Sequence, residues 1–310
     1  MGKVFCAPLQ GYTDKVYRET HARLFGGVDA YYTPFVRLEK KGFRNRDVRD
    51  VTSGEEDHAH VIPQLIASTP DEFRSIVYLF QEKSHKEVNI NLGCPFPMQA
   101  RNHKGAGLLA YPDEAALLLE TVKEFPEISF SVKMRLGWDH VEESLALLPL
   151  LNRLPLSHVV MHPRLGIWQY KGELDMEGFS RFYEACEKPL LFNGDLVRLE
   201  EIRSIEERYP KLMGVMIGRG LLASPWLAAE YVSAKPLSLE EKRAKLIAFH
   251  ASLLDSYSTR LEGGEHQILT KMKTLWDYLL PEADKKLRKK VLKSNSLISY
   301  RAAVADLLNH

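Results

Sequence analysis

Cysteine is scarce in this chain of 310 residues, which contains only Cys6, Cys94 and Cys186. These three residues show neither paired spacing nor a CxxC motif. The pattern argues against a disulfide framework and against a zinc site, and it is typical of a reducing cytoplasm. We therefore expect a cytoplasmic protein that holds no metal.

Long apolar stretches are missing as well. Nowhere do about 18 apolar residues follow one another, so no membrane-spanning segment is expected. Residues 1–6 lack the apolar run of a signal peptide. Neither sign of charge is in large excess: the formal net charge is +1, which by itself neither favours nor excludes a nucleic-acid partner.

Hydrophobic residues make up 45% of the chain, enough for a large buried core. Helix-spaced segments such as 112–124 and 140–151 separate short apolar or β-branched runs at 4–7, 30–35, 60–66, 88–92, 129–134, 158–162, 190–193 and 214–217. Eight such units predict an α/β fold, the TIM (β/α)8 barrel, which takes about 250 residues. A doubly wound open sheet is the alternative, although it more often has five or six strands.

Polar residues and glycines follow the predicted strands at the point where each strand ends. They are Gln64, Asn91, Gly93, Cys94, Lys133, His162, Asn193, Gly194, Asp195, Gly218 and Arg219. In a TIM barrel the carboxyl ends of all strands meet at one rim, where catalytic groups gather. The repetition of these residues at the same place in successive units favours the barrel over the open sheet.

The segments after the last two predicted strands contain glycines. They are Asn193-Gly194-Asp195 and Gly218-Arg219-Gly220, and the latter precedes a helical stretch at 221–231. Glycine lets backbone amides approach a phosphate closely, and a helix N-terminus favours an anion. Barrel enzymes often hold a phosphate at these two loops, so we expect a cofactor that carries a phosphate.

The pattern changes near residue 235. Ser238 and Glu241 form a predicted capping box, and apolar residues then recur at helical spacing. We therefore expect a barrel domain at 1–235, followed by a small all-helical C-terminal domain at 236–310. Residues 236–310 contain 13 Lys and Arg against 9 Asp and Glu. Six of these cations lie within 285–293. Such a cluster binds a phosphate backbone or is simply a solvated helix face.

Several motifs occur in one order along the chain: APLQGYTD at 7–14, NINLGCP at 89–95, KGAGLL at 104–109, SVKMRLGW at 131–138 and MIGRG at 216–220. Together they resemble the tRNA-dihydrouridine synthase family of bacteria, with the DusC-like branch as one candidate subfamily. The resemblance implies FMN as cofactor, NADPH as reductant and a tRNA uridine as substrate. Leu9, Phe96 and Ile167 depart from the usual family pattern, which leaves the subfamily and the target uridine open.

The resemblance also implies roles for single residues. Cys94 would be the proton donor, and Asn91 would orient the uracil ring. The cofactor-binding residues would be Pro8, Leu9, Gln64, Lys133, His162, Asn193, Gly194, Asp195, Gly218 and Arg219. A thiol with a pKa of about 8.5 still carries its proton near pH 7, as a general acid must. A lysine at the end of an apolar strand suits the anionic edge of a reduced flavin.

RNA contacts are predicted at cations near the rim and in the helical region. These are Lys104, Arg135, Lys271, Lys273, Lys286, Lys289 and Lys290. The target uridine must leave its base stack to reach a flavin at a barrel rim. A monomer is expected, because a bound tRNA would cover much of that rim.

Two other functions compete with this prediction. An FMN-dependent barrel oxidoreductase acting on a small molecule such as a pyrimidine would share the phosphate site but would not need the basic helical region. A non-catalytic RNA-binding protein on a degenerate barrel would not need Cys94, Lys133 or the loop at Gly218-Arg219.

Overall fold

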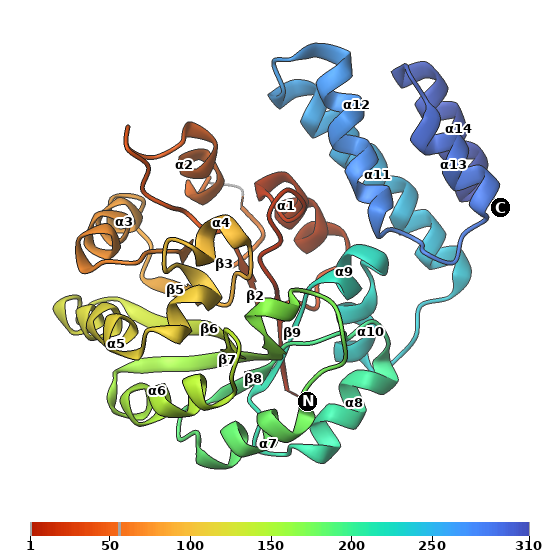
Figure 1. Cartoon of the computed structure of the whole chain (residues 1–310). Helices are drawn as coiled ribbons and strands as arrows, with labels where there is room; N and C mark the ends of the chain where they lie inside the picture. The colour runs from red at the N-terminus through yellow and green to blue at the C-terminus, as the bar shows by residue number, and fades with distance from the viewer. Residues whose placement is uncertain (1, 55–56, 310) are drawn as a thin grey trace.

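The computed structural model describes residues 2–54 and 57–309, and within them parallel strands wind into a barrel surrounded by helices (Figure 1). The first strand pairs with the last, which closes the barrel at that seam. The strands are β1 (Lys3–Cys6), β2 (Ala30–Tyr32), β3 (Val61–Ile62), β4 (Gln64–Leu65), β5 (Glu87–Leu92), β6 (Ser129–Gly137), β7 (Leu156–Leu165), β8 (Leu190–Phe192) and β9 (Gly214–Ile217). The predicted TIM barrel is confirmed.

The predicted strand at 60–66 is divided into β3 and β4 by Pro63. Proline has no N–H to donate to a sheet, so the ladder breaks there. β3 pairs with β2, whereas β4 pairs with β5, and the Pro63 carbonyl accepts a hydrogen bond from Asn89 N at 2.9 Å. Together, β3 and β4 therefore occupy one of the eight strand positions of the barrel.

The helices around the barrel are α1 (Lys15–Leu24), α2 (Asn45–Val51), α3 (Pro70–Glu82), α4 (Pro97–Ala100), α5 (Pro112–Glu120), α6 (Glu142–Arg153), α7 (Met176–Ala185), α8 (Leu199–Arg208), α9 (Arg219–Ala223) and α10 (Leu227–Ser233). The expected helical stretch at 221–231 is helical but interrupted. Two short helices stand there, with Pro225 between them, because a proline inside a helix removes one hydrogen bond and clashes with the preceding turn.

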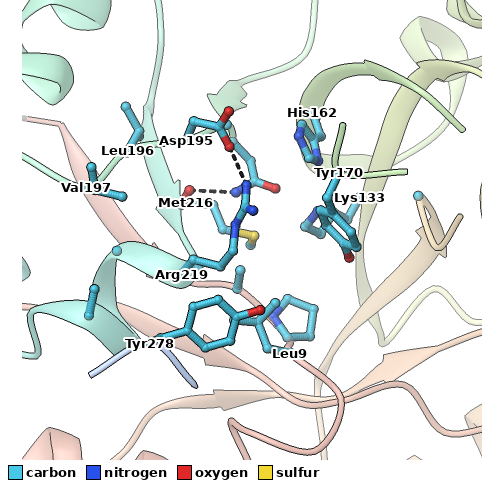
Figure 2. A pocket seen from close by; sticks show the side chains of 18 of the residues that line it. Leu9, Lys133, His162, Tyr170, Asp195, Leu196, Val197, Met216, Arg219 and Tyr278 are labelled. Carbon is cyan, nitrogen blue, oxygen red and sulfur yellow. Dashed lines mark hydrogen bonds and ion pairs between the residues drawn. The ribbon is translucent and has the colours of Figure 1, made fainter. Parts of the chain in front are cut away.

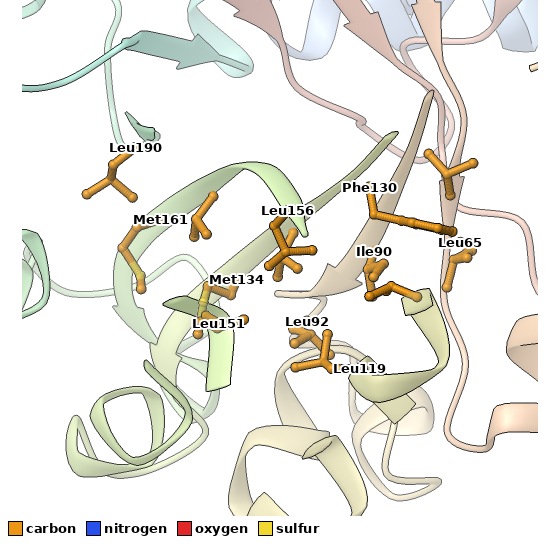
Figure 3. Close-up of a cluster of buried hydrophobic side chains, with 14 of the residues drawn as sticks. Leu65, Ile90, Leu92, Leu119, Phe130, Met134, Leu151, Leu156, Met161 and Leu190 are labelled. Carbon is orange, nitrogen blue, oxygen red and sulfur yellow. The ribbon is translucent and has the colours of Figure 1, made fainter. Parts of the chain in front are cut away.

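Alternate residues along each strand face opposite sides of the sheet. On β6, Phe130, Val132 and Met134 pack outward in the cluster between sheet and helices (Figure 3). Ser131 and Lys133 therefore face the barrel interior, as the strand period of two requires. The same alternation turns the polar residues of β4, β5 and β7 inward, where they either hydrogen-bond to one another or reach the rim.

The C-terminal region is helical, with α11 (Leu239–Arg260), α12 (Gly264–Thr274), α13 (Lys285–Lys293) and α14 (Leu297–Asn309). Ser238 caps α11 through the expected capping box with Glu241. The apolar cluster of these helices also includes Tyr17 and Phe25 from the α1 segment and Leu222 from α9, so the helices pack against the barrel (Figure 1). Among the described residues, no helix has the length and apolar character to cross a bilayer.

Asp14 joins the barrel to the C-terminal helices. Its carboxylate caps α1 by accepting from Tyr17 N at 3.1 Å, and it accepts from Tyr257 Oη on α11 at 2.8 Å. Lys271 Nζ on α12 lies 2.8 Å from the same carboxylate and donates to the Gly11 carbonyl at 2.7 Å. The structure thus engages Lys271, a predicted RNA contact, at this junction.

We predict that Asp14→Ala lowers the free energy of unfolding by about 2–3 kcal/mol, because a helix cap and two hydrogen bonds across the junction are lost together. Asp284→Ala is the matched control, since Asp284 only caps α13, through Lys286 N and Leu287 N. That change should cost about 1 kcal/mol. Urea denaturation measures both values, and equal losses would contradict a linking role for Asp14.

Candidate functional site

Two adjoining cavities open at the carboxyl ends of the barrel strands. The first has a volume of about 480 Å³ and is formed by residues in or after β1, β5, β6, β7, β8 and β9 and by residues of the C-terminal region (Figure 2). The second, of about 360 Å³, contains Asn91 and Cys94. The first cavity is lined by many of the predicted cofactor residues: Pro8, Leu9, Lys133, His162, Asn193, Gly194, Asp195, Gly218 and Arg219. Lys133 lines both cavities, so it lies between the predicted cofactor site and the thiol.

Lys133 has no acidic partner among residues 2–54 and 57–309. Burial, together with the nearby positive charge of Arg135, lowers the pKa of Lys133 to about 7. A buried ammonium without a counter-charge is costly. An anionic group of a ligand placed beside Lys133 would restore its charge and supply the missing counter-charge.

Asp195 is held between two guanidinium groups. Arg164 pairs with its carboxylate from the β7 side. Arg219 pairs with it from the β9 side, as Figure 2 shows. Burial alone would raise the pKa of Asp195, but the two arginines outweigh burial and hold this pKa below its usual value. The group therefore carries one more positive charge than negative, which favours binding of an anion.

His162 lies in the same wall of the cavity. Burial lowers the pKa of His162 well below its usual value, and the positive charges of Arg135, Lys133 and Arg164 lower it further. Arg164 donates to His162 Nε2 at 3.3 Å, so the proton of the neutral ring stands on Nδ1. His162 is thus suited to donate a hydrogen bond and not to exchange protons near neutral pH.

The glycines of the two expected phosphate loops lie against neighbouring segments. A Cβ on Gly220 would stand 2.0 Å from the Leu196 carbonyl oxygen, and one on Gly218 would stand 3.3 Å from Ala7 Cβ. Asn193 Nδ2 donates to the Met216 carbonyl at 2.8 Å and ties the loop after β8 to β9 (Figure 2). Glycine at Gly220 therefore lets this segment approach the Leu196 backbone more closely than a residue with a side chain could.

The loop that carries Cys94 is fixed on several sides. Asn91 Oδ1 accepts from Gly93 N and Cys94 N at 3.0 and 2.8 Å, and Arg135 Nε donates to the Gly93 carbonyl at 3.0 Å. Gly105, at φ +62°, passes so close that a Cβ there would stand 2.7 Å from the Cys94 carbonyl oxygen. Burial raises the pKa of the Cys94 thiol, so the thiol keeps its proton near neutral pH.

The remaining predicted residues lie elsewhere. Gln64 is fully buried behind Asn91 and lines neither cavity. Lys104 pairs with Glu72 at 2.8 Å, away from both cavities. Lys273 donates to the Ser294 carbonyl, and Lys290 pairs with Asp306, whereas two predicted RNA contacts stand exposed on α13: Lys286 and Lys289.

Two tyrosines line both cavities but were not singled out from the sequence: Tyr170 and Tyr278. The guanidinium carbons of Arg135 and Arg219 lie 5.3 and 5.4 Å from the centre of the Tyr170 ring. Tyr170 lies five residues after the end of β7, whereas the residues predicted to lie at the rim stand at or directly after the strand ends. Tyr278 belongs to the C-terminal region, where its spacing indicated only a helix core.

Comparison with known proteins agrees with the geometry. A family model for dihydrouridine synthases matches residues 5–304. The chain is 28% identical over 262 residues to a probable tRNA-dihydrouridine synthase 2 of Bacillus subtilis, covering 81% of this chain and 78% of that protein. It is 24% identical over 226 residues to tRNA-dihydrouridine synthase B of Pasteurella multocida, covering 73% of this chain and 67% of that one.

Solved structures with a similar fold include the old yellow enzyme homologue of Zymomonas mobilis. Its TM-score is 0.55 at 12% identity, and the match covers 77% of this chain and 92% of that one. Morphinone reductase gives a TM-score of 0.53 at 11% identity over 76% of this chain and 87% of that chain. At these identities the likeness concerns the barrel fold.

We predict that iodoacetamide alkylates Cys94 with an apparent pKa above that of a free cysteine, because burial disfavours the thiolate. Lys133→Met should slow alkylation below pH 7, where the Lys133 ammonium still carries the positive charge that lowers the pKa of Cys94. Lys104→Met is the control, because that ammonium pairs with Glu72. Peptide mass spectrometry across pH measures the rates; identical profiles in both variants would contradict the coupling.

Proposed function

The chain belongs to the dihydrouridine synthase family, and from this premise we propose that it is an FMN-dependent tRNA-dihydrouridine synthase that uses NADPH to reduce one uridine of tRNA. One observation carries the proposal: a protonated thiol at Cys94 and a cation without a counter-charge at Lys133 line the same cavity. A proton donor and a stabiliser of negative charge are the two groups that reduction of a C=C bond conjugated to a carbonyl requires.

The residues of the first cavity fit FMN. Lys133 would face the edge of the ring system that becomes negative on reduction, and His162 Nδ1–H would donate to the ring. Arg219 with the backbone at Gly194 and Gly218 would hold the phosphate, where the arginines around Asp195 leave a positive excess. Bound FMN would supply the hydride that C6 of the uracil receives.

Cys94 would transfer its proton to C5 of the uracil. The thiol is left as a thiolate, which takes up a proton from solvent before the next turnover, so the electron pair and the two hydrogens of the product are accounted for. Arg135 fixes the Cys94 loop through Gly93, and with Lys133 it would stabilise negative charge on the uracil carbonyl oxygens and on the thiolate.

The substrate would be an extruded base of tRNA. Phe96 is 63% exposed and lines the cavity beside Cys94, and Tyr170 is 53% exposed at the same cavity. Aromatic rings at such a mouth can stack on an unpaired base, at about 1–3 kcal/mol each. Lys286 and Lys289 on α13 would contact the phosphate backbone, and the enzyme would act as a monomer.

We predict that Cys94→Ala lowers the rate of uridine reduction about 100-fold or more, which is the usual loss when a general acid is removed. Reduction of the flavin by NADPH should remain within about twofold, because the thiol takes no part in that step. The assay uses tRNA from cells without dihydrouridine and locates the product by mass spectrometry, which also identifies the target uridine. A flavin-containing protein that consumes NADPH and leaves every uridine intact would instead indicate an oxidoreductase for small molecules.

Replacing Lys286 and Lys289 with glutamine should weaken tRNA binding. The slope of the logarithm of the binding constant against the logarithm of the salt concentration should become shallower, by the amount expected for the loss of about one to two phosphate contacts. Lys211→Gln is the control, because Lys211 precedes β9 and so lies at the opposite end of the barrel. Filter binding over a range of KCl concentrations measures the slope. An unchanged slope in the double variant would exclude α13 as an RNA contact.

A further inference from the structure

Four polar side chains form one row across the barrel interior below the rim. Gln64, Asn89, Ser131 and His158 are successive register partners on β4, β5, β6 and β7. All four are buried, Gln64 and Asn89 completely, and none of them lines either cavity. Because neighbouring strands lie about 4.8 Å apart, side chains at one level can hydrogen-bond sideways.

The direction of these hydrogen bonds is fixed at the Cys94 loop. A backbone N–H can only donate, so Asn91 must present its oxygen to Gly93 N and Cys94 N. Its amide group then donates to Gln64 Oε1 at 2.7 Å, and Gln64 donates to Asn89 Oδ1 at 2.7 Å. Each amide therefore sets the orientation of the next one along the row.

The far end of the row continues in the same direction. Asn89 donates to Ser131 Oγ at 2.8 Å, and Ser131 Oγ lies 3.4 Å from Tyr32 Oη, which bonds His158 Nε2. Burial lowers the pKa of His158 to about 4, so the ring is neutral. With its proton on Nδ1, His158 donates to Ser157 Oγ at 3.0 Å, and Ser157 ends the chain at a backbone carbonyl.

We propose that this chain of hydrogen bonds makes Asn89, Ser131 and Tyr32 positioning residues for the Cys94 thiol, although they lie outside the cavities. The chain holds Asn91 in the one amide orientation that satisfies both loop N–H groups. Without it, the Gln64 oxygen that accepts from the Asn91 NH₂ group is no longer fixed, so Asn91 is held by the loop N–H groups alone and the loop becomes more mobile. The catalytic part of this inference rests on the proposed function, whereas the effect on the thiol does not.

Asn89→Leu tests the inference, because leucine is similar in size and makes no hydrogen bonds. Cys94 should be alkylated by iodoacetamide about threefold faster at pH 7, with the pH profile shifted down by about half a unit, since a released loop brings the thiol closer to water. In single turnovers of the reduced enzyme with tRNA, the rate of uridine reduction should fall at least about tenfold, whereas the rate of flavin reduction by NADPH should stay the same. Tyr32→Phe interrupts the chain farther away and should act in the same direction, more weakly.

Val160→Ala is the matched control, because Val160 also faces the barrel interior and belongs to its apolar part. Flavin absorbance and the melting temperature show that each variant is folded. Alkylation profiles of Asn89→Leu and Tyr32→Phe that equal that of Val160→Ala would overturn the positioning role, whatever their melting temperatures. A wild-type protein that reduces no uridine would refute the proposed function, while the alkylation rates would still decide the inference.

Discussion

Closure of the barrel through the pairing of β1 with β9 is the constraint on which the site depends. The register sets Cys6 beside Ile217, and Ala7 N donates to the Ile217 carbonyl at 2.9 Å. This pairing brings the residues after the first strand against those after the last, so that Pro8, Leu9 and Gly218 line the same cavity. With every strand parallel, all carboxyl ends reach the same rim, and the period of two decides which side chains enter the interior.

Charge gives the rim its chemical character. Lys133, Arg135 and Arg219 line the first cavity, and the two carboxylates there, Asp195 and Asp277, are both engaged: Asp195 by arginines and Asp277 by the Tyr12 hydroxyl at 2.8 Å. Burial holds the pKa of His162 far below its usual value, and the positive charges of Arg135 and Lys133 add to this effect. The same two charges lower the pKa of Cys94 against the effect of burial, which makes the thiol a stronger acid than burial alone would allow.

Much of the fold could be predicted from local patterns, because strand runs and the residues that follow them are close in sequence. All eight predicted runs contain strands. Cys94, Lys133 and His162 line the cavities at the carboxyl ends of the strands, as their positions at the ends of the predicted strands indicated. Contacts between distant segments could not be predicted in this way. The partners of Lys104 and Lys271 are residues 32 and 257 positions away in the chain, and no spacing rule distinguishes a cation on RNA from one in an ion pair. Tyr278 was missed for the same reason: helical periodicity places it in a core but does not show which cavity it reaches.

The position of Tyr278 also limits how this enzyme family can diversify. Its ring packs edge-on against Tyr12 of the barrel at 5.2 Å, and Tyr12 in turn donates to Asp277. The wall of the barrel cavity is thus built partly by Asp277, Tyr278 and Pro281, which lie between α12 and α13. A chimera that joined this barrel to the helical region of a relative would exchange part of that wall, so that the two parts must change together in evolution and do not form interchangeable modules.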